Sequence, residues 1–153
     1  MENKSRCFLV QQPVTIFSCQ EIPVIPLREY LERIYFYTHC SYASMILSMI
    51  YVDRFLHSTG MSITSLNVHK LLLTAIMLAS KFNDDAYCSN SFFAEVGCVT
   101  LDELNQMEQT FLRCICFSLF VSESLFILYS SSLHQRVCTA SCSLCSVSVL
   151  SPI

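Results

Sequence analysis

The residues of this chain that could do chemistry fall into two groups, an acid–base pair and a set of cysteines. In the stretch YVDRFLHSTG, residues 51–60, Asp53 and Arg54 stand side by side near the end of an apolar run. Asp53 lies seven, four and three residues after Ile46, Met49 and Ile50, so helical spacing places it on their side and predicts a charge on an apolar face. A carboxylate in such a place is a candidate either for an active site or for a buried ion pair.

The ten cysteines are the second group, and their thiols could form disulfides, bind a metal or act as nucleophiles. Several of them lie inside apolar runs, where a cysteine behaves as a small hydrophobic residue. The first residues, MENKSRCFLVQQPVTIF, lack the uninterrupted apolar core of a signal peptide. We therefore expect an intracellular protein with reduced thiols, in the nucleus, the cytoplasm or both.

Two specific sites built on cysteine were weighed. Four residues near the end of the chain have the ligand chemistry of zinc: His134, Cys138, Cys142 and Cys145. Their spacing does not reproduce the usual paired ligands, and a Ser-rich disordered segment accounts for it equally well. Cys114 and Cys116 lie in an apolar run that lacks the local motif of a cysteine hydrolase. We expect no catalytic residue, no metal site and no cofactor.

The composition narrows the class of protein. The chain has 153 residues, enough for one domain with a core, and 53% of them are apolar against 14% charged. The net charge of −3 offers no basic stripe for nucleic acid. Two glycines and four prolines argue for helices joined by short loops. The longest uncharged stretch before the tail, residues 35–52, contains a His-Cys-Ser break and several hydroxyl side chains, so we expect no membrane span.

Apolar residues recur at helical spacing through most of the chain. The expected helices cover residues 26–38, 41–57, 65–82, 90–97 and 100–117, with a further one over 122–133. The third is apolar nearly all round over residues 71–79, which is typical of the buried centre of a bundle. Ser41 is a predicted N-cap, Gly60 is a predicted helix stop, and Thr100 with Glu103 matches a capping box. The pattern predicts an all-α domain.

These elements divide the chain into three parts. We expect an irregular N-terminal lead-in over residues 1–25, a single domain over residues 26–133, and a Ser/Cys-rich tail over residues 134–153. The tail has no charge after Arg136 and no helical period. We therefore expect it to be disordered or to be an atypical C-terminus, either alternative or truncated.

Three motifs occur in the order and spacing of a cyclin box. They are YVDRFL from residue 51, LLTAIMLASKFNDD from residue 72 and LNQMEQTFLRCICFSLFV from residue 104. The chain resembles the plant U-type cyclins, also called P-type, which are relatives of the yeast cyclin that serves the phosphate-signalling kinase. The resemblance covers about residues 20–133 and is most specific in NVHKLLLTAIMLASKFNDD. It implies an all-α, single cyclin-box domain of five helices around a buried third helix.

The resemblance implies kinase-binding roles for Lys81, Glu108, Phe82 and Asp85. Lys81 matches the lysine that reaches kinase backbone carbonyls, and Glu108 matches the fifth-helix glutamate that contacts the kinase beside it. Phe82 follows Lys81, and Asp85 belongs to an Asp-Asp pair that stands where many cyclins have two glutamates. Lys81 and Glu108 have apolar neighbours at helical spacing, which suits an interface with an apolar centre and polar anchors. Without the spacing of the cyclin motifs, the residues favour solvated helix-end charges for this pair; the motif spacing favours the interface.

The resemblance also implies a structural role for the acid in YVDRFL. Arg28 matches the first-helix arginine of the box, and Asp53 matches the second-helix aspartate with which it pairs. We expect this pair to be buried and to fasten the first helix to the second, and we identify no partner for Arg54. The tryptophan that large cyclins use for docking substrates is missing, and Ile34 falls near its position, which puts that docking route in doubt.

The function implied by the resemblance is that of a regulatory subunit. Such a protein binds and activates a cyclin-dependent protein kinase by packing on its C-helix, in the cell cycle and cell division or in phosphate signalling, and is not itself an enzyme. Nucleic acid, a membrane and a small-molecule substrate are not expected as partners. Two alternatives remain open: a cyclin-fold adaptor that binds proteins without activating a kinase, and a truncated isoform that folds poorly.

Overall fold

The computed structural model describes the backbone of residues 14–141 and the side chains of residues 16–136. Its elements are η1 (Val14–Phe17), α1 (Leu27–Thr38), α2 (Tyr42–Thr59), α3 (Val68–Asn83), α4 (Asn90–Gly97), α5 (Leu101–Cys114) and α6 (Glu123–Ser141). Every regular element in these residues is helical, which confirms the all-α prediction. The described chain forms two compact units that divide after Phe120; the first holds η1 to α5 and the second holds α6.

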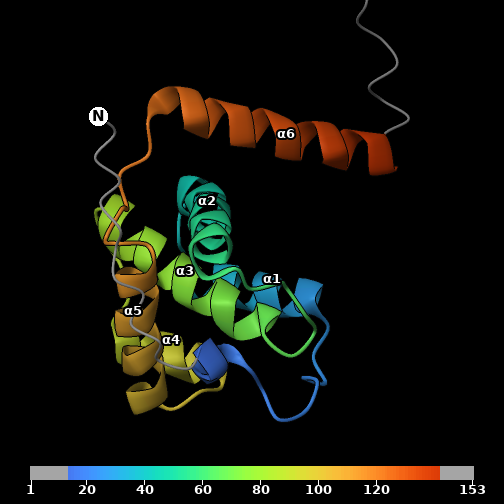
Figure 1. The fold of residues 1–153 in the computed structure, drawn as a ribbon. Helices are drawn as coiled ribbons and strands as arrows, with labels where there is room; N and C mark the ends of the chain where they lie inside the picture. The colour runs from blue at the N-terminus through green and yellow to red at the C-terminus, as the bar shows by residue number, and fades with distance from the viewer. Residues whose placement is uncertain (1–13, 142–153) are drawn as a thin grey trace, which may run out of the picture. The chain divides into compact units, whose positions relative to one another are not determined.

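Helix α3 is the centre of the first unit. All its side chains from Leu71 to Ser80 are buried. The segment is apolar on nearly every side, so it needs other helices around it. It packs against α1, α2, α4 and α5, as Figure 1 shows. The prediction of a buried third helix is confirmed.

A cluster of three aromatic rings connects the start of the described chain to the core. Phe17 in η1 is fully buried and meets Phe55 of α2 edge-on at 5.1 Å and Phe111 of α5 at 6.1 Å between ring centroids. The rings of Phe55 and Phe111 stack at 4.7 Å. Residues 1–25 were expected to be an irregular lead-in. Within the described part of that segment, however, η1 contributes a side chain to the core because its phenyl ring closes this cluster.

Hydrogen bonds at the helix ends follow the predicted caps. The Ser41 hydroxyl accepts the backbone N–H of Ser44 at 3.1 Å and starts α2. Gly60 ends that helix with a φ of +69°, in the left-handed region that glycine adopts without strain. Ser89, not identified from the sequence, caps α4 by accepting the N–H of Phe92 at 3.3 Å.

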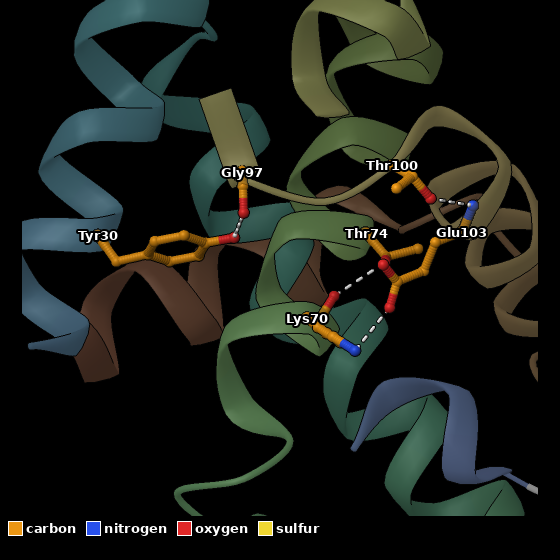
Figure 2. Close-up of polar contacts among 6 residues, drawn as sticks. All are labelled: Tyr30, Lys70, Thr74, Gly97, Thr100 and Glu103. Carbon is orange, nitrogen blue, oxygen red and sulfur yellow. Dashed lines mark hydrogen bonds and ion pairs between the residues drawn. The ribbon is translucent and has the colours of Figure 1, made fainter. Parts of the chain in front are cut away.

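The capping box at the start of α5 is half formed. The Thr100 hydroxyl accepts the backbone N–H of Glu103 at 3.2 Å, as predicted. The Glu103 carboxylate binds Lys70 of α3 at 2.6 Å, and Figure 2 shows both contacts. An ammonium group offers this carboxylate a stronger hydrogen bond than a neutral N–H does, so the side chain joins α5 to α3.

Helix α4 packs closely on its neighbours at Gly97. A Cβ atom at this position would overlap the side chain of Leu73 in α3, so the glycine allows the two helices to approach. The Tyr30 hydroxyl of α1 donates to the Gly97 carbonyl at 3.2 Å, as Figure 2 shows. Burial raises the pKa of Tyr30 well above its usual value, so this hydroxyl keeps its proton and its role as donor.

Two helices end elsewhere than the sequence predicted. Helix α5 stops at Cys114 rather than near Phe117, because Cys116 and Phe117 adopt left-handed φ angles of 52° and 55°. Helix α6 continues to Ser141, so the predicted domain end at residue 133 and the first part of the predicted tail lie inside a helix. Residues 142–153 of that tail lie outside the described residues.

The predicted buried pair between Arg28 and Asp53 is wrong with respect to burial. The Arg28 side chain is 88% exposed and binds Glu32, one turn later on α1, at 2.9 Å. Asp53 is exposed as well. Met49, Asp53 and His57 follow one another at four-residue spacing along an exposed strip of α2. The apolar Met49 belongs to this outer strip, and counting it with the core face led to the wrong prediction.

Candidate functional site

The structure brings Lys81 and Glu108 together. Lys81 lies in the last turn of α3, and its ammonium nitrogen is 2.6 Å from Oε1 of Glu108 on α5. The two side chains are 31% and 16% exposed. This partial burial distinguishes the pair from a solvated surface contact, because water screens each charge less when its partner displaces solvent.

An asparagine from a third helix completes this cluster. Asn90, the first residue of α4, accepts a hydrogen bond from the Lys81 ammonium at 2.9 Å through Oδ1. Its Nδ2 donates to Oε2 of Glu108 at 2.7 Å and to Oδ1 of Asn105 at 2.8 Å. We call Lys81, Asn90, Asn105 and Glu108 the α3–α4–α5 cluster. Neither asparagine was predicted from the sequence, because a neutral amide residue and its neighbours in the chain do not indicate a distant hydrogen-bond partner.

Two exposed aromatic side chains lie between Lys81 and Asn90 in the sequence. Phe82, next to Lys81, is 57% exposed, and Tyr87 in the loop between α3 and α4 is 57% exposed. Asp85 in the same loop is also exposed. The predicted set Lys81, Phe82 and Asp85 therefore lies at the C-terminal end of α3, where Glu108 joins it from α5. A large exposed aromatic residue beside half-buried polar groups is typical of a protein-binding surface.

A second polar network holds Asp84, the residue that follows α3. Its carboxylate accepts hydrogen bonds from the hydroxyls of Ser44 and Ser80, both at 2.9 Å, and from the backbone N–H of Ser41 at 3.2 Å. Partial burial alone would raise the pKa of Asp84, but the hydrogen bonds from the three serines outweigh it and lower the pKa. Asp84 therefore ties the end of α3 to the start of α2.

Two residues of the stretch YVDRFLHS, Tyr51 and Arg54, donate hydrogen bonds from a different side of α2 than Asp53. The Arg54 guanidinium donates to the carbonyls of Ser118 at 2.6 Å and Phe120 at 3.0 Å. The Tyr51 hydroxyl donates to the Leu119 carbonyl at 2.8 Å, and burial raises its pKa to about 12. These contacts satisfy backbone carbonyls in the segment after α5, where no helix supplies partners. Arg54, whose partner could not be identified from the sequence, fastens α2 to that segment.

The resolved pKa shifts do not indicate an activated nucleophile. Burial raises the pKa of the Cys40 thiol, which keeps it protonated and unreactive. Among the described side chains, residues 16–136, no group of three His, Cys, Asp or Glu gathers as a metal site. Cys138, Cys142 and Cys145 of the zinc candidate set lie outside these side chains.

A buried central helix is wrapped by four others, and a polar cluster joins its C-terminal end to α5. Comparison with protein families gives the class of protein. The family model described as Cyclin matches residues 2–119, and the chain belongs to the cyclin family. Membership supports a regulatory role.

The individual relatives are plant cyclins of the U and P types. The chain is 39% identical to Cyclin-U4-1 of Arabidopsis thaliana over 127 residues, which are 82% of this chain and 63% of that protein. It is 40% identical to Cyclin-U2-1 of the same plant over 123 residues, 80% of this chain and 55% of the relative. Cyclin-P3-1 of Oryza sativa subsp. japonica is 36% identical over 127 residues, 83% of this chain and 54% of the relative. The chain thus spans little more than half the length of these relatives.

Proposed function

We propose that this cyclin is the regulatory subunit of a cyclin-dependent protein kinase, in the cell cycle or in phosphate signalling. The binding surface consists of Lys81, Phe82, Asp85 and Glu108. The observation that carries the proposal is the half-buried Lys81–Glu108 pair, which joins α3 to α5. Phe82, the residue after Lys81 in the sequence, is exposed. The matched motifs of the cyclin family fall on the same residues.

The mechanism requires no reactive group from the cyclin. A protein kinase transfers phosphate only when a strand lysine pairs with a glutamate on its mobile C-helix. A protein that binds the inward position of that helix better than the outward position shifts the kinase toward its active state. An apolar contact through Phe82 supplies affinity, of the order of 1.5–3 kcal/mol for a fully buried phenylalanine side chain. Lys81 and Glu108 supply hydrogen bonds to the kinase backbone.

The same two helices offer a matched control for this surface. Lys70 and Glu103 form a second ion pair between α3 and α5, also at 2.6 Å and with side chains 16% and 30% exposed. Lys70 lies in the first turn of α3, whereas Lys81 lies in the last. One double variant replaces Lys81 and Glu108 by alanine, and the other replaces Lys70 and Glu103 by alanine. Each removes one lysine, one glutamate and one ion pair. They differ in which end of α3 they change.

The proposal is tested with a panel of purified cyclin-dependent kinases and a generic peptide substrate. The unsubstituted chain should activate at least one kinase. Lys81→Ala with Glu108→Ala should reduce affinity for that kinase at least tenfold, and Lys70→Ala with Glu103→Ala should leave affinity within about twofold. Equal losses in both variants would contradict the assigned surface. Binding without activation would instead support the adaptor alternative.

A further inference from the structure

Asn90 uses every hydrogen-bonding group of its side chain within the α3–α4–α5 cluster. Its carbonyl oxygen accepts from Lys81, and its amide nitrogen donates to both Glu108 and Asn105. An asparagine side chain has two N–H donors and one carbonyl acceptor, so this amide leaves neither donor over. Its orientation is therefore fixed by contacts with two other helices, α3 and α5.

The side chain of Asn90 is not needed for the helix on which it lies. Ser89 already caps α4 through its hydroxyl group. The Asn90 carbonyl oxygen accepts its hydrogen bond from Lys81, on another helix. The contacts of Asn90 with Lys81 and Glu108 must therefore be explained by the cluster itself.

The two oxygens of Glu108 have different partners. Oε1 binds the Lys81 ammonium at 2.6 Å, and Oε2 binds the Asn90 amide at 2.7 Å. If the ammonium of Lys81 turns toward an acceptor on a partner protein, Oε1 loses its cation while Oε2 keeps its hydrogen bond. Without the Asn90 amide, the Glu108 carboxylate would lose its main stabilising contact although it is only 16% exposed.

We propose that Asn90 is a positioning residue of the kinase-binding surface, which holds Glu108 in place while Lys81 exchanges its intramolecular partner for a kinase carbonyl. This inference rests on the function proposed above and assigns a role to a residue outside the predicted site. Asn90 acts through Lys81 and Glu108 and makes no contact with the kinase of its own.

Two substitutions separate positioning from a purely structural role. Asn90→Ala removes the acceptor and both donors. Asn90→Asp keeps the shape and the acceptor for Lys81, but it places a carboxylate opposite Glu108. Like charges at this distance disfavour double ionisation, so one of the two carboxyl groups binds a proton at a higher pH than usual. The protonated carboxyl group then donates to its neighbour as the amide did.

The charged groups that contact this position are Lys81 from α3 and Glu108 from α5, and Asn105 is neutral. Repulsion between the two carboxylates raises the pH at which they share a proton, and the Lys81 ammonium lowers it, so the Asn90→Asp variant should bind kinase weakly at about pH 7.5 and recover only as the pH falls toward about 5. A loss caused only by weaker packing of α4 would not recover in this way. Asn105→Ala is the matched control, because it removes one amide of the cluster and leaves the contacts of Asn90 with Lys81 and Glu108 intact.

The experiment measures the dissociation constant of the full chain for the kinase that the unsubstituted chain activates, across this pH range. Asn90→Ala should weaken binding about tenfold, and the control should stay within about twofold. The ratio of Asn90→Asp to unsubstituted affinity should rise as the pH falls. If Asn90→Ala does not fold, the Asp variant carries the test, since its shape is conserved.

Three results would overturn the inference. Asn90→Ala could bind as tightly as the unsubstituted chain, the Asp variant could lose the same factor at every pH, or Asn105→Ala could lose as much as Asn90→Ala. Each of these would leave the proposed kinase surface in place. If the unsubstituted chain binds no kinase of the panel, the proposed function fails and this inference fails with it.

Discussion

Replacing Asp84 by alanine tests whether the end of α3 is held to the start of α2 by a single carboxylate. The substitution removes the acceptor for the hydroxyls of Ser44 and Ser80 and for the backbone N–H of Ser41. It also removes a contact with the Asn83 amide at 3.2 Å. Ser44 and Ser80 are buried, so water replaces the lost carboxylate poorly at their hydroxyl groups.

The expected loss follows from these contacts. A hydrogen bond to a charged group contributes about 1.5–3 kcal/mol, and contacts to one carboxylate are not additive. Asp84 itself is half-buried, which reduces each contribution. We expect the free energy of unfolding to fall by about 2–3 kcal/mol. For a domain of this size the melting temperature should fall by roughly 10 °C.

The direction of the Asp84 pKa shift determines how the stability loss in Asp84→Ala depends on pH. The hydrogen bonds lower the pKa of Asp84 in the folded chain relative to the unfolded chain. The carboxylate therefore contributes its full stabilisation above the usual aspartate pKa of about 3.9, and loses it as the pH falls through the lower, folded-state pKa. The stability difference between the unsubstituted chain and Asp84→Ala should be constant near neutral pH and should shrink below about pH 4.

Thermal unfolding followed by circular dichroism measures this effect, with Asp85→Ala as the control. Asp85 is the next residue along the chain, carries the same charge and is exposed. Its replacement should change the melting temperature by less than about 2 °C. Equal shifts for the two variants, or a difference that persists in acid, would refute the role assigned to the Asp84 carboxylate.

Three further variants test other contacts of the first unit. Tyr30→Phe removes the buried donor to the Gly97 carbonyl and should lower the free energy of unfolding by about 1–2 kcal/mol in urea titration; no change would mean that the carbonyl finds another donor. Gly97→Ala should cost about 1–3 kcal/mol, because the Leu73 side chain must move, and an unaltered urea midpoint would show that α3 and α4 separate freely. Arg54→Met should raise amide hydrogen exchange over residues 115–120 while kinase affinity stays the same, and unchanged protection would contradict its bracing role.

Periodicity was sufficient to predict α1 to α5, apart from the end of α5, because each buries one apolar face and α3 buries all of its faces. It did not predict η1, which is too short to show a period. It failed at Asp53, where Met49 at the same helical angle is 39% exposed rather than part of the core. The sequence alone does not show whether a single apolar residue at the edge of a helix face belongs to the buried face or to the exposed one. The neighbouring helices decide this, and they are distant in the sequence.

The polar contacts show the same limit more clearly. The cap at Thr100 was predictable because the hydroxyl and its N–H partner are three residues apart. The contacts of Asp84 with Ser44 and of Asn90 with Glu108 join residues 40 and 18 positions apart. Asparagine and serine are common surface residues, so their types alone do not predict such partners. Lys81 and Glu108 were identified only through the cyclin motifs.

The two polar networks together fix the segment of residues 84–90, which contains Asp85 of the proposed kinase surface. Asp84 anchors its beginning to α2, and Asn90 anchors its end to α3 and α5. The exposed Asp85 and Tyr87 lie between these anchors. A segment held at both ends loses less conformational freedom on binding than an unanchored loop, so more of the contact energy remains as affinity. Loosening either anchor should therefore weaken kinase binding even though neither anchoring residue belongs to the binding surface itself.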